Sequence, residues 1–159
     1  MTESTECSKQ ALQWFEQGFN CAQAVLLAFD ERVGIERELA MKIALGLGGG
    51  LGRCGEVCGA VNGACMVLGM DSGDTADPYS KENRAAAYGR VKEFIRTFRA
   101  RCGAVTCRDL IGYDISTDEG RAAAVEDGVF KRLCPGFVEN AALIVESMLD
   151  AGPAGSDSR

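Results

Sequence analysis

Four of the eight cysteines lie where the sequence predicts the start of a helix. These four are Cys21, Cys58, Cys107 and Cys134. The N-terminus of a helix offers unpaired N–H groups and partial positive charge, and both favour a thiolate over a thiol. Thiolates attack disulfides and bind metals. The four cysteines are therefore the candidate catalytic residues, and we expect redox or metal–sulfur chemistry.

The residues next to these cysteines support the predicted helix starts. An asparagine precedes Cys21 and a threonine precedes Cys107, and both are good N-cap residues. This places the two cysteines in the first turn of their helices. Cys134 is expected at the N-cap itself, because Pro135 is favoured at the first helical position.

A glycine-rich segment, residues 46–55, precedes Cys58 and cannot form a stable helix. Glycines recur every fourth residue at 55, 59 and 63, which predicts a bare strip along one helix face. Such a strip lets a second helix or a cofactor come close to Cys58. The candidate cofactor contacts are Gly49, Gly50, Gly59 and Gly63.

The other four cysteines are expected to matter less. Cys102 completes an apolar helix face and Cys65 lies two turns after Cys58, so both are interpreted as packing residues. Cys7 lies near the N-terminus and is interpreted as incidental. Cys54 forms a Cys-x-x-x-Cys pair with Cys58, and remains open as a resolving thiol, a further metal ligand or a bystander.

Two arginines stand beside cysteines in the sequence, and a nearby guanidinium favours the thiolate. Arg53 precedes Cys54, and Arg108 follows Cys107. Both arginines are therefore expected to lower the pKa of a neighbouring thiol.

Composition narrows the classes of function. The 159 residues suit one domain, and the net charge of −6 argues against nucleic acid as a partner. The chain has no histidine, which removes Cys-His catalytic pairs and imidazole ligands. Any metal would have to be held by sulfur or carboxylate.

The start of the chain resembles no signal peptide, and residues 57–70 are too short an apolar run to span a membrane. We therefore expect a cytoplasmic protein, where thiols are kept reduced. A structural disulfide framework is not expected there.

Apolar spacing predicts an all-α single-domain bundle of about six to eight helices with a glycine-rich loop. The domain is expected over residues 1–150, with a disordered tail at 151–159. Helices are predicted at residues 4–17, 20–32, 36–46, 57–69 and 77–101, near 106 and 116, and at 135–149. Predicted buried faces include Leu39, Ile43 and Leu47, and a stripe from Tyr88 to Cys102.

The same segments resemble a family of proteins described as redox-active and named for a C…GCAxxG…C…C pattern. The matching segments are residues 20–25, 48–63, 107–110 and Cys134. The resemblance implies four characteristic cysteines, at positions 21, 58, 107 and 134, and a redox role. It implies no substrate.

The sequence is compatible with three functions. The first is a thiol-dependent oxidoreductase acting on an unknown redox partner or small molecule, in which Cys58 attacks and Cys21, Cys107 or Cys134 resolves the mixed disulfide. The second is a metal-binding protein, with an iron–sulfur cluster or zinc held by the same four cysteines. The third is a structural or adaptor protein with packed cysteines. A homodimer is a further expectation.

Overall fold

The computed structural model describes residues 4–72, 77 and 80–152. Within them the chain is all-α, as predicted, and the only β pairing is an isolated antiparallel bridge between Val57 and Thr106. The predicted disordered tail falls mostly on residues 153–159, which lie outside the described residues.

The helices follow one another with short connections. Their bounds are α1 Glu6–Glu16, α2 Cys21–Leu27, α3 Asp30–Val33, α4 Arg37–Ala44, the 3₁₀ turn η1 Leu45–Leu47, α5 Gly48–Leu51, α6 Gly59–Asp71, α7 Lys81–Cys102, α8 Cys107–Ile111, α9 Asp118–Glu126 and α10 Val129–Asp150.

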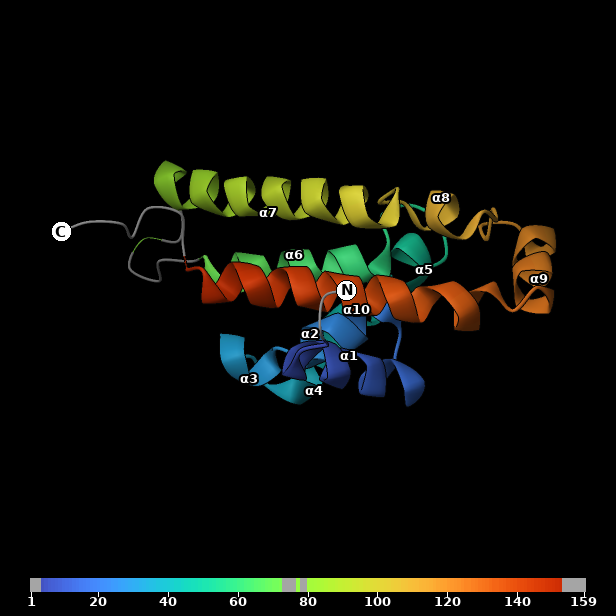
Figure 1. The fold of residues 1–159 in the computed structure, drawn as a ribbon, viewed down its shortest axis with the longest axis horizontal. Coiled ribbons are helices and arrows are strands. Elements are labelled where there is room, and N and C mark those ends of the chain that lie inside the picture. Colours follow the sequence, from blue (N-terminus) through green and yellow to red (C-terminus); the bar gives the residue numbers. More distant parts are fainter. Residues whose placement is uncertain (1–3, 73–76, 78–79, 153–159) are drawn as a thin grey trace.

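Three long helices run along the long axis of the molecule (Figure 1). Helix α7 forms one side, α6 and α10 lie beside it, and α1 to α4 cover the opposite side. The short helices α5, α8 and α9 gather at one end. Helix α10 contacts α1, α2, α6 and α7, so it is the element that joins the two sides.

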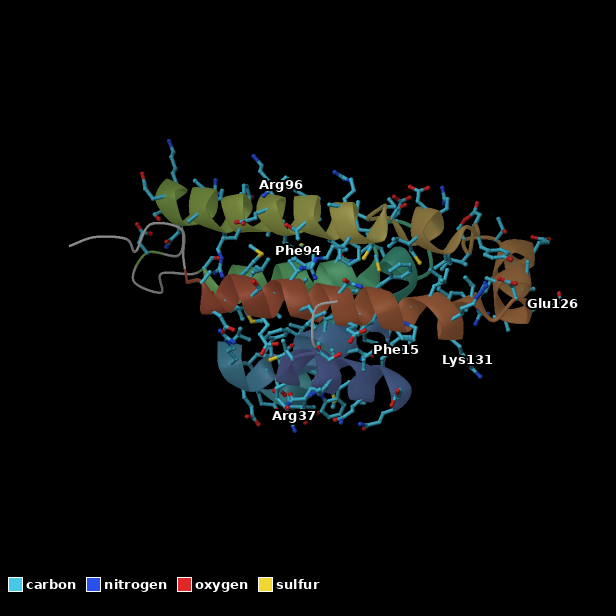
Figure 2. The ribbon with its side chains drawn as sticks, viewed as in Figure 1. Phe15, Arg37, Phe94, Arg96, Glu126 and Lys131 are labelled. Carbon is cyan, nitrogen blue, oxygen red and sulfur yellow. The ribbon has the colours of Figure 1, made fainter. Side chains whose placement is uncertain are left out.

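The core lies where α2, α6, α7 and α10 meet. Phe94 and Phe98 of α7 are fully buried there, with ring centroids 5.8 Å apart. Figure 2 shows Phe94 directed into the molecule and Arg96 directed away from it. The long helix α7 therefore has one apolar face and one solvated face.

The prediction for the last helix is wrong at its N-terminal end. Helix α10 begins at Val129, after Gly128 in the left-handed conformation, and it continues through Pro135. Proline lacks an N–H donor but keeps a helical φ, and here the burial of Val129 supports the added turns. Cys134 is consequently inside the helix and not at its N-cap.

Two predicted apolar faces are wrong in part, although Leu47 of the first and Phe98 of the second do pack in or against the core. Leu39 and Ile43 of α4 are 50% and 46% exposed, and the buried face of this helix is made by Ala40 and Ala44. Small alanines let α4 lie close to α2, while the larger side chains point outward. In α7, Tyr88 is 61% exposed and the buried Arg90 bonds to Asp71 instead.

Helix starts are shifted by a few residues in two places. Helix α7 is capped by Ser80, whose hydroxyl accepts from the N–H of Asn83, and not by the predicted residues 77–78; residue 78 lies outside the described residues. Helix α9 is capped by Thr117 and not by Ser116. None of the described helices combines the length and apolar character needed to cross a membrane.

Candidate functional site

A cavity of about 590 Å³ lies at the end of the molecule where the short helices gather. All four predicted site cysteines line it. Cys21 begins α2, Cys58 is the N-cap of α6, Cys107 begins α8 and Cys134 comes from within α10. Four separate helices therefore bring four thiols to one cavity, and no disulfide joins them.

Cys58 and Cys107 are placed by a pair of antiparallel backbone segments, residues 55–58 and 105–108. The N–H of Cys58 donates to the carbonyl of Val105 at 2.9 Å, and the N–H of Cys107 donates to Glu56 at 2.6 Å. These bonds align the starts of α6 and α8. The two thiols are thus held by backbone geometry and not by side-chain packing alone.

Cys21 reaches the same cavity because α2 packs closely on α6. A methyl group on Gly63 would lie 2.7 Å from the carbonyl oxygen of Ala22, and one on Gly59 would lie 3.1 Å from the Cβ of Cys21. A larger residue at either position would push the helices apart. Gly59 and Gly63 of the predicted strip therefore do bring a second cysteine-bearing helix start beside Cys58. The third predicted member, Gly55, lies before α6 with a φ of 74° and packs against Arg108 instead.

The glycine-rich loop closes another wall by winding left-handed. Five consecutive residues, 49–53, have φ between 61° and 70°. Two of these are not glycine, Leu51 and Arg53, and this conformation costs an L-residue roughly 1–2 kcal/mol. Gly50 allows the loop to contact Cys107, since a methyl group there would lie 2.8 Å from the Cβ of that cysteine.

The four candidate cofactor glycines divide into two groups. Gly49 and Gly59 line the cavity. Gly50 and Gly63 are instead positions of close packing, the first against Glu56 and Cys107 and the second against α2.

Burial overrides the helix-start effect at three of the four cysteines. It raises the pKa of Cys58 to about 12, although the N–H groups of Ala60 and Val61 act in the opposite direction. It raises the pKa of Cys107 to about 11. The expectation that the start of a helix lowers the pKa of Cys58 is therefore wrong. Loss of hydration destabilises the thiolate more than the N–H groups at the helix start stabilise it.

Cys134 differs from the other three cysteines because its sulfur accepts a hydrogen bond from the thiol of Cys21. The side chain of Cys21 hydrogen-bonds to Cys134 and lowers the pKa of Cys134, while the pKa of Cys21 is raised well above its ordinary value by this bond and by burial. A hydrogen bond to the charged form stabilises that form. Of the two thiols, Cys134 is therefore the one that loses its proton more readily.

The remaining cysteines lie outside the cavity lining. Cys54 is exposed in the loop, and its carbonyl accepts from Arg108 at 3.2 Å. Cys65 and Cys102 pack against the core, and burial raises the pKa of each to about 11. Cys7 lies in α1, where burial and the nearby carboxyl of Glu146 raise its pKa to about 11.

Of the two arginines noted in the sequence, only Arg53 lines the cavity. Arg108 is engaged by the Cys54 carbonyl and by Asp114, at 3.3 Å, and it packs over Gly55. The predicted effect of Arg108 on Cys107 is not seen, since the pKa of that thiol is raised.

Several lining residues gave no signal in the sequence. Arg121 of α9 lies at the cavity, and three phenylalanines from α1 and α10 form part of its wall. These are Phe15, Phe130 and Phe137. They come from distant segments, so only the packing of α1 and α9 against α10 could have revealed them. Phe15 lies beside α10 in Figure 2.

The metal-binding alternative stays a prediction. Within the described part of the chain, no three histidine, cysteine, aspartate or glutamate residues are arranged to hold a metal ion. That alternative named Cys21, Cys58, Cys107 and Cys134 as ligands, with Cys54 as a further candidate. Cys54 lies outside the cavity lining.

The fold and the cavity define an all-α protein with four free thiols around one small-molecule-sized cavity. A family model described as "Putative redox-active protein (C_GCAxxG_C_C)" matches residues 19–148, and the chain belongs to this family. The matched range contains all four cavity cysteines and excludes Cys7. None of the curated proteins and none of the solved structures compared with the chain matches it.

Proposed function

We propose that the protein is a thiol–disulfide oxidoreductase in which Cys134 attacks and Cys21 resolves. The observation that carries this proposal is the lowered pKa of Cys134, with Cys21 as its hydrogen-bond donor. The attacking group in disulfide exchange is a thiolate, and its partner must lie within reach of the mixed disulfide. The lowered pKa of Cys134 and its hydrogen bond with Cys21 support both requirements, and membership of a redox-active family agrees with them.

The reaction balances as two exchanges. The Cys134 thiolate attacks one sulfur of a disulfide R–S–S–R′, which forms a Cys134–S–S–R bond and releases R′S⁻, which then takes a proton from water. Cys21 loses its proton and attacks the sulfur of Cys134, which forms the Cys21–Cys134 disulfide and releases RSH. Two protein thiols are oxidised and one substrate disulfide is reduced. An external dithiol reverses the protein disulfide by the same steps.

The surroundings of the pair suit this chemistry. Cys58 and Cys107 adjoin it in the same cavity, and their raised pKa values keep them as thiols near neutral pH. The proposal therefore replaces Cys58 with Cys134 as the attacking residue. The surrounding apolar wall limits access to molecules that can enter a cavity of about 590 Å³.

Single-turnover reduction of 2-hydroxyethyl disulfide tests the proposal. The reduced protein should release two thiols for each protein disulfide formed. Cys21→Ser should release one thiol and retain a mixed disulfide on Cys134, visible by mass spectrometry, because the hydrogen-bonded partner that resolves it is gone. Cys134→Ser should react at least about tenfold more slowly, because its attacking thiolate is gone. Cys102→Ser, outside the cavity lining, is the matched control and should behave as the parent. Unchanged rate and stoichiometry in Cys134→Ser would refute the assignment.

A further inference from the structure

The polar groups around the cavity mouth are of one sign. Arg53 and Arg121 line the cavity, while its described lining residues include no aspartate or glutamate. Both arginines are exposed, which places them on the open side. Apart from its cysteines, the ionisable lining of the cavity is therefore basic, whereas the chain as a whole has a net charge of −6.

The guanidinium groups of the two arginines form no ion pair with any described residue. The other exposed arginines near this end of the molecule pair with carboxylates: Arg108 with Asp114, and Arg132 with Asp127. The described residues offer no such carboxylate to the side chain of Arg53 or Arg121. Guanidinium groups of this kind bind carboxylate, sulfonate or phosphate groups through two parallel N–H donors.

Arg53 occupies its place despite a strained backbone. Its φ is 70°, a left-handed conformation that favours glycine. Its stem packs over Gly49, where a methyl group would lie 2.9 Å from the Cγ of Arg53. Strain at a non-glycine residue persists where the surrounding structure imposes it, and such positions cluster at ligand sites. The loop is thus built so that this side chain reaches the cavity.

The rest of the wall is apolar and partly aromatic. Its members include Leu110, Ile111, Ile115 and the phenylalanines Phe15, Phe130 and Phe137. The volume lies within the range of roughly 300–1,000 Å³ that small-molecule sites occupy. An apolar wall beneath a basic rim fits a ligand with an apolar body and an anionic end.

We propose that the cavity binds a small organic anion with an apolar, aromatic-sized body, whose acidic group lies between Arg53 and Arg121 and whose body lies against the phenylalanines. This inference gives the substrate class of the proposed oxidoreductase and rests on that function for its catalytic meaning. Binding of such an anion, however, requires no thiol chemistry, so the two proposals can fail separately.

Two fluorescent probes that differ by one acidic group test the inference. These are 8-anilinonaphthalene-1-sulfonate and the neutral N-phenyl-1-naphthylamine, each titrated into the reduced full-length protein. Arg53→Gln and Arg121→Gln should each weaken sulfonate binding about tenfold, because each removes a charge-assisted contact. Binding of the neutral probe should change by less than about twofold, since apolar contacts dominate it. Arg96→Gln, on the solvated face of α7, is the matched control and should change neither.

A second variant of Arg53 distinguishes loss of the guanidinium from a folding defect. Arg53→Gly removes the guanidinium and also relieves the positive φ, so it should fold at least as well as the parent and still bind the sulfonate weakly. Unchanged sulfonate affinity in the Arg53 and Arg121 variants, or equal weakening of both probes, would overturn the inference. The sulfonate titrations require no disulfide reduction, and the reduction of 2-hydroxyethyl disulfide requires no acidic group on the substrate. Either result can therefore fail while the other holds, which separates a failure of this inference from a failure of the proposed function.

Discussion

At the scale of single residues, the chemistry depends on how each thiol is surrounded. Cys58, Cys107 and Cys21 all begin or cap helices, yet the pKa of each is raised: by burial at Cys58 and Cys107, and by the hydrogen bond with Cys134 and then burial at Cys21. Cys134 lies inside α10 and still has the lowered pKa, because Cys21 donates to it. At Cys134 one direct hydrogen bond therefore outweighs the opposing effect of burial.

The donor role of Cys21 can be separated from its packing by two substitutions. Cys21→Ala removes the hydrogen-bond donor, so the pKa of Cys134 should rise. The pH profile of Cys134 alkylation should then shift to higher pH. Cys21→Ser keeps a hydroxyl donor and should leave the profile closer to that of the parent. The measurement is the pH dependence of iodoacetamide labelling of Cys134, resolved by peptide mass spectrometry. Identical profiles for the two variants would show that the hydrogen bond does not set the pKa.

At the scale of elements, close packing and a strained loop build the cavity wall. Helix starts at Cys21 and Cys107 could be predicted because capping depends on neighbouring residues. The glycine spacing likewise predicted the close approach at Gly59 and Gly63. The start of α10 could not be predicted, because tertiary packing carries the helix through Pro135 against the local signal.

The close approach of α2 and α6 gives a matched pair of glycine substitutions in one helix. Gly63→Ala should lower the free energy of unfolding by about 1–3 kcal/mol, because the methyl group would meet the carbonyl of Ala22. Gly69→Ala meets no atom within 4 Å and should raise the free energy of unfolding by up to about 1 kcal/mol. Urea denaturation measures both. Equal effects of the two substitutions would contradict the packing described for α6.

In the left-handed loop, a substitution to glycine should stabilise the protein. Leu51→Gly should raise the free energy of unfolding by about 1 kcal/mol, because it relieves a φ of 63° at an exposed residue. Leu39→Gly, at an exposed position within α4, should lower it by about 1 kcal/mol. Thermal and urea unfolding of both variants check the pair. A destabilised Leu51→Gly protein would mean that this residue is not strained.

At the scale of the whole molecule, residues from six helices (α1, α2, α6, α8, α9 and α10) and from the glycine-rich loop meet at a single cavity. The sequence predicted the four cysteines but not Arg121 or the three phenylalanines of the wall. Their assembly depends on how α1, α9 and α10 pack, and no local pattern encodes it. The raised pKa values also belong to this scale, since burial of a thiol is a property of the complete fold.

Burial of thiols should make global stability depend on pH in the alkaline range. The pKa of Cys58 is about 12 in the folded protein against 9.0 ordinarily, so the unfolded chain releases this proton first. The contribution is fully present below pH 9 and is lost as the pH rises toward 12. In that window Cys58 should lower the unfolding free energy of the parent protein by up to about 1.4 kcal/mol per pH unit. Cys58→Ala should remove this contribution to the slope. Exposed Cys54→Ala is the control, and equal slopes in both variants would refute the burial effect.

The central claim is that Cys21 and Cys134 form the working pair, and disulfide mapping tests it most directly. The reduced protein is oxidised by stepwise addition of a mild oxidant, quenched, digested and examined by mass spectrometry. The first disulfide to appear should join Cys21 to Cys134, before any bond that involves Cys58 or Cys107. A first disulfide between any other two cysteines, or oxidation that leaves Cys134 free, would contradict it.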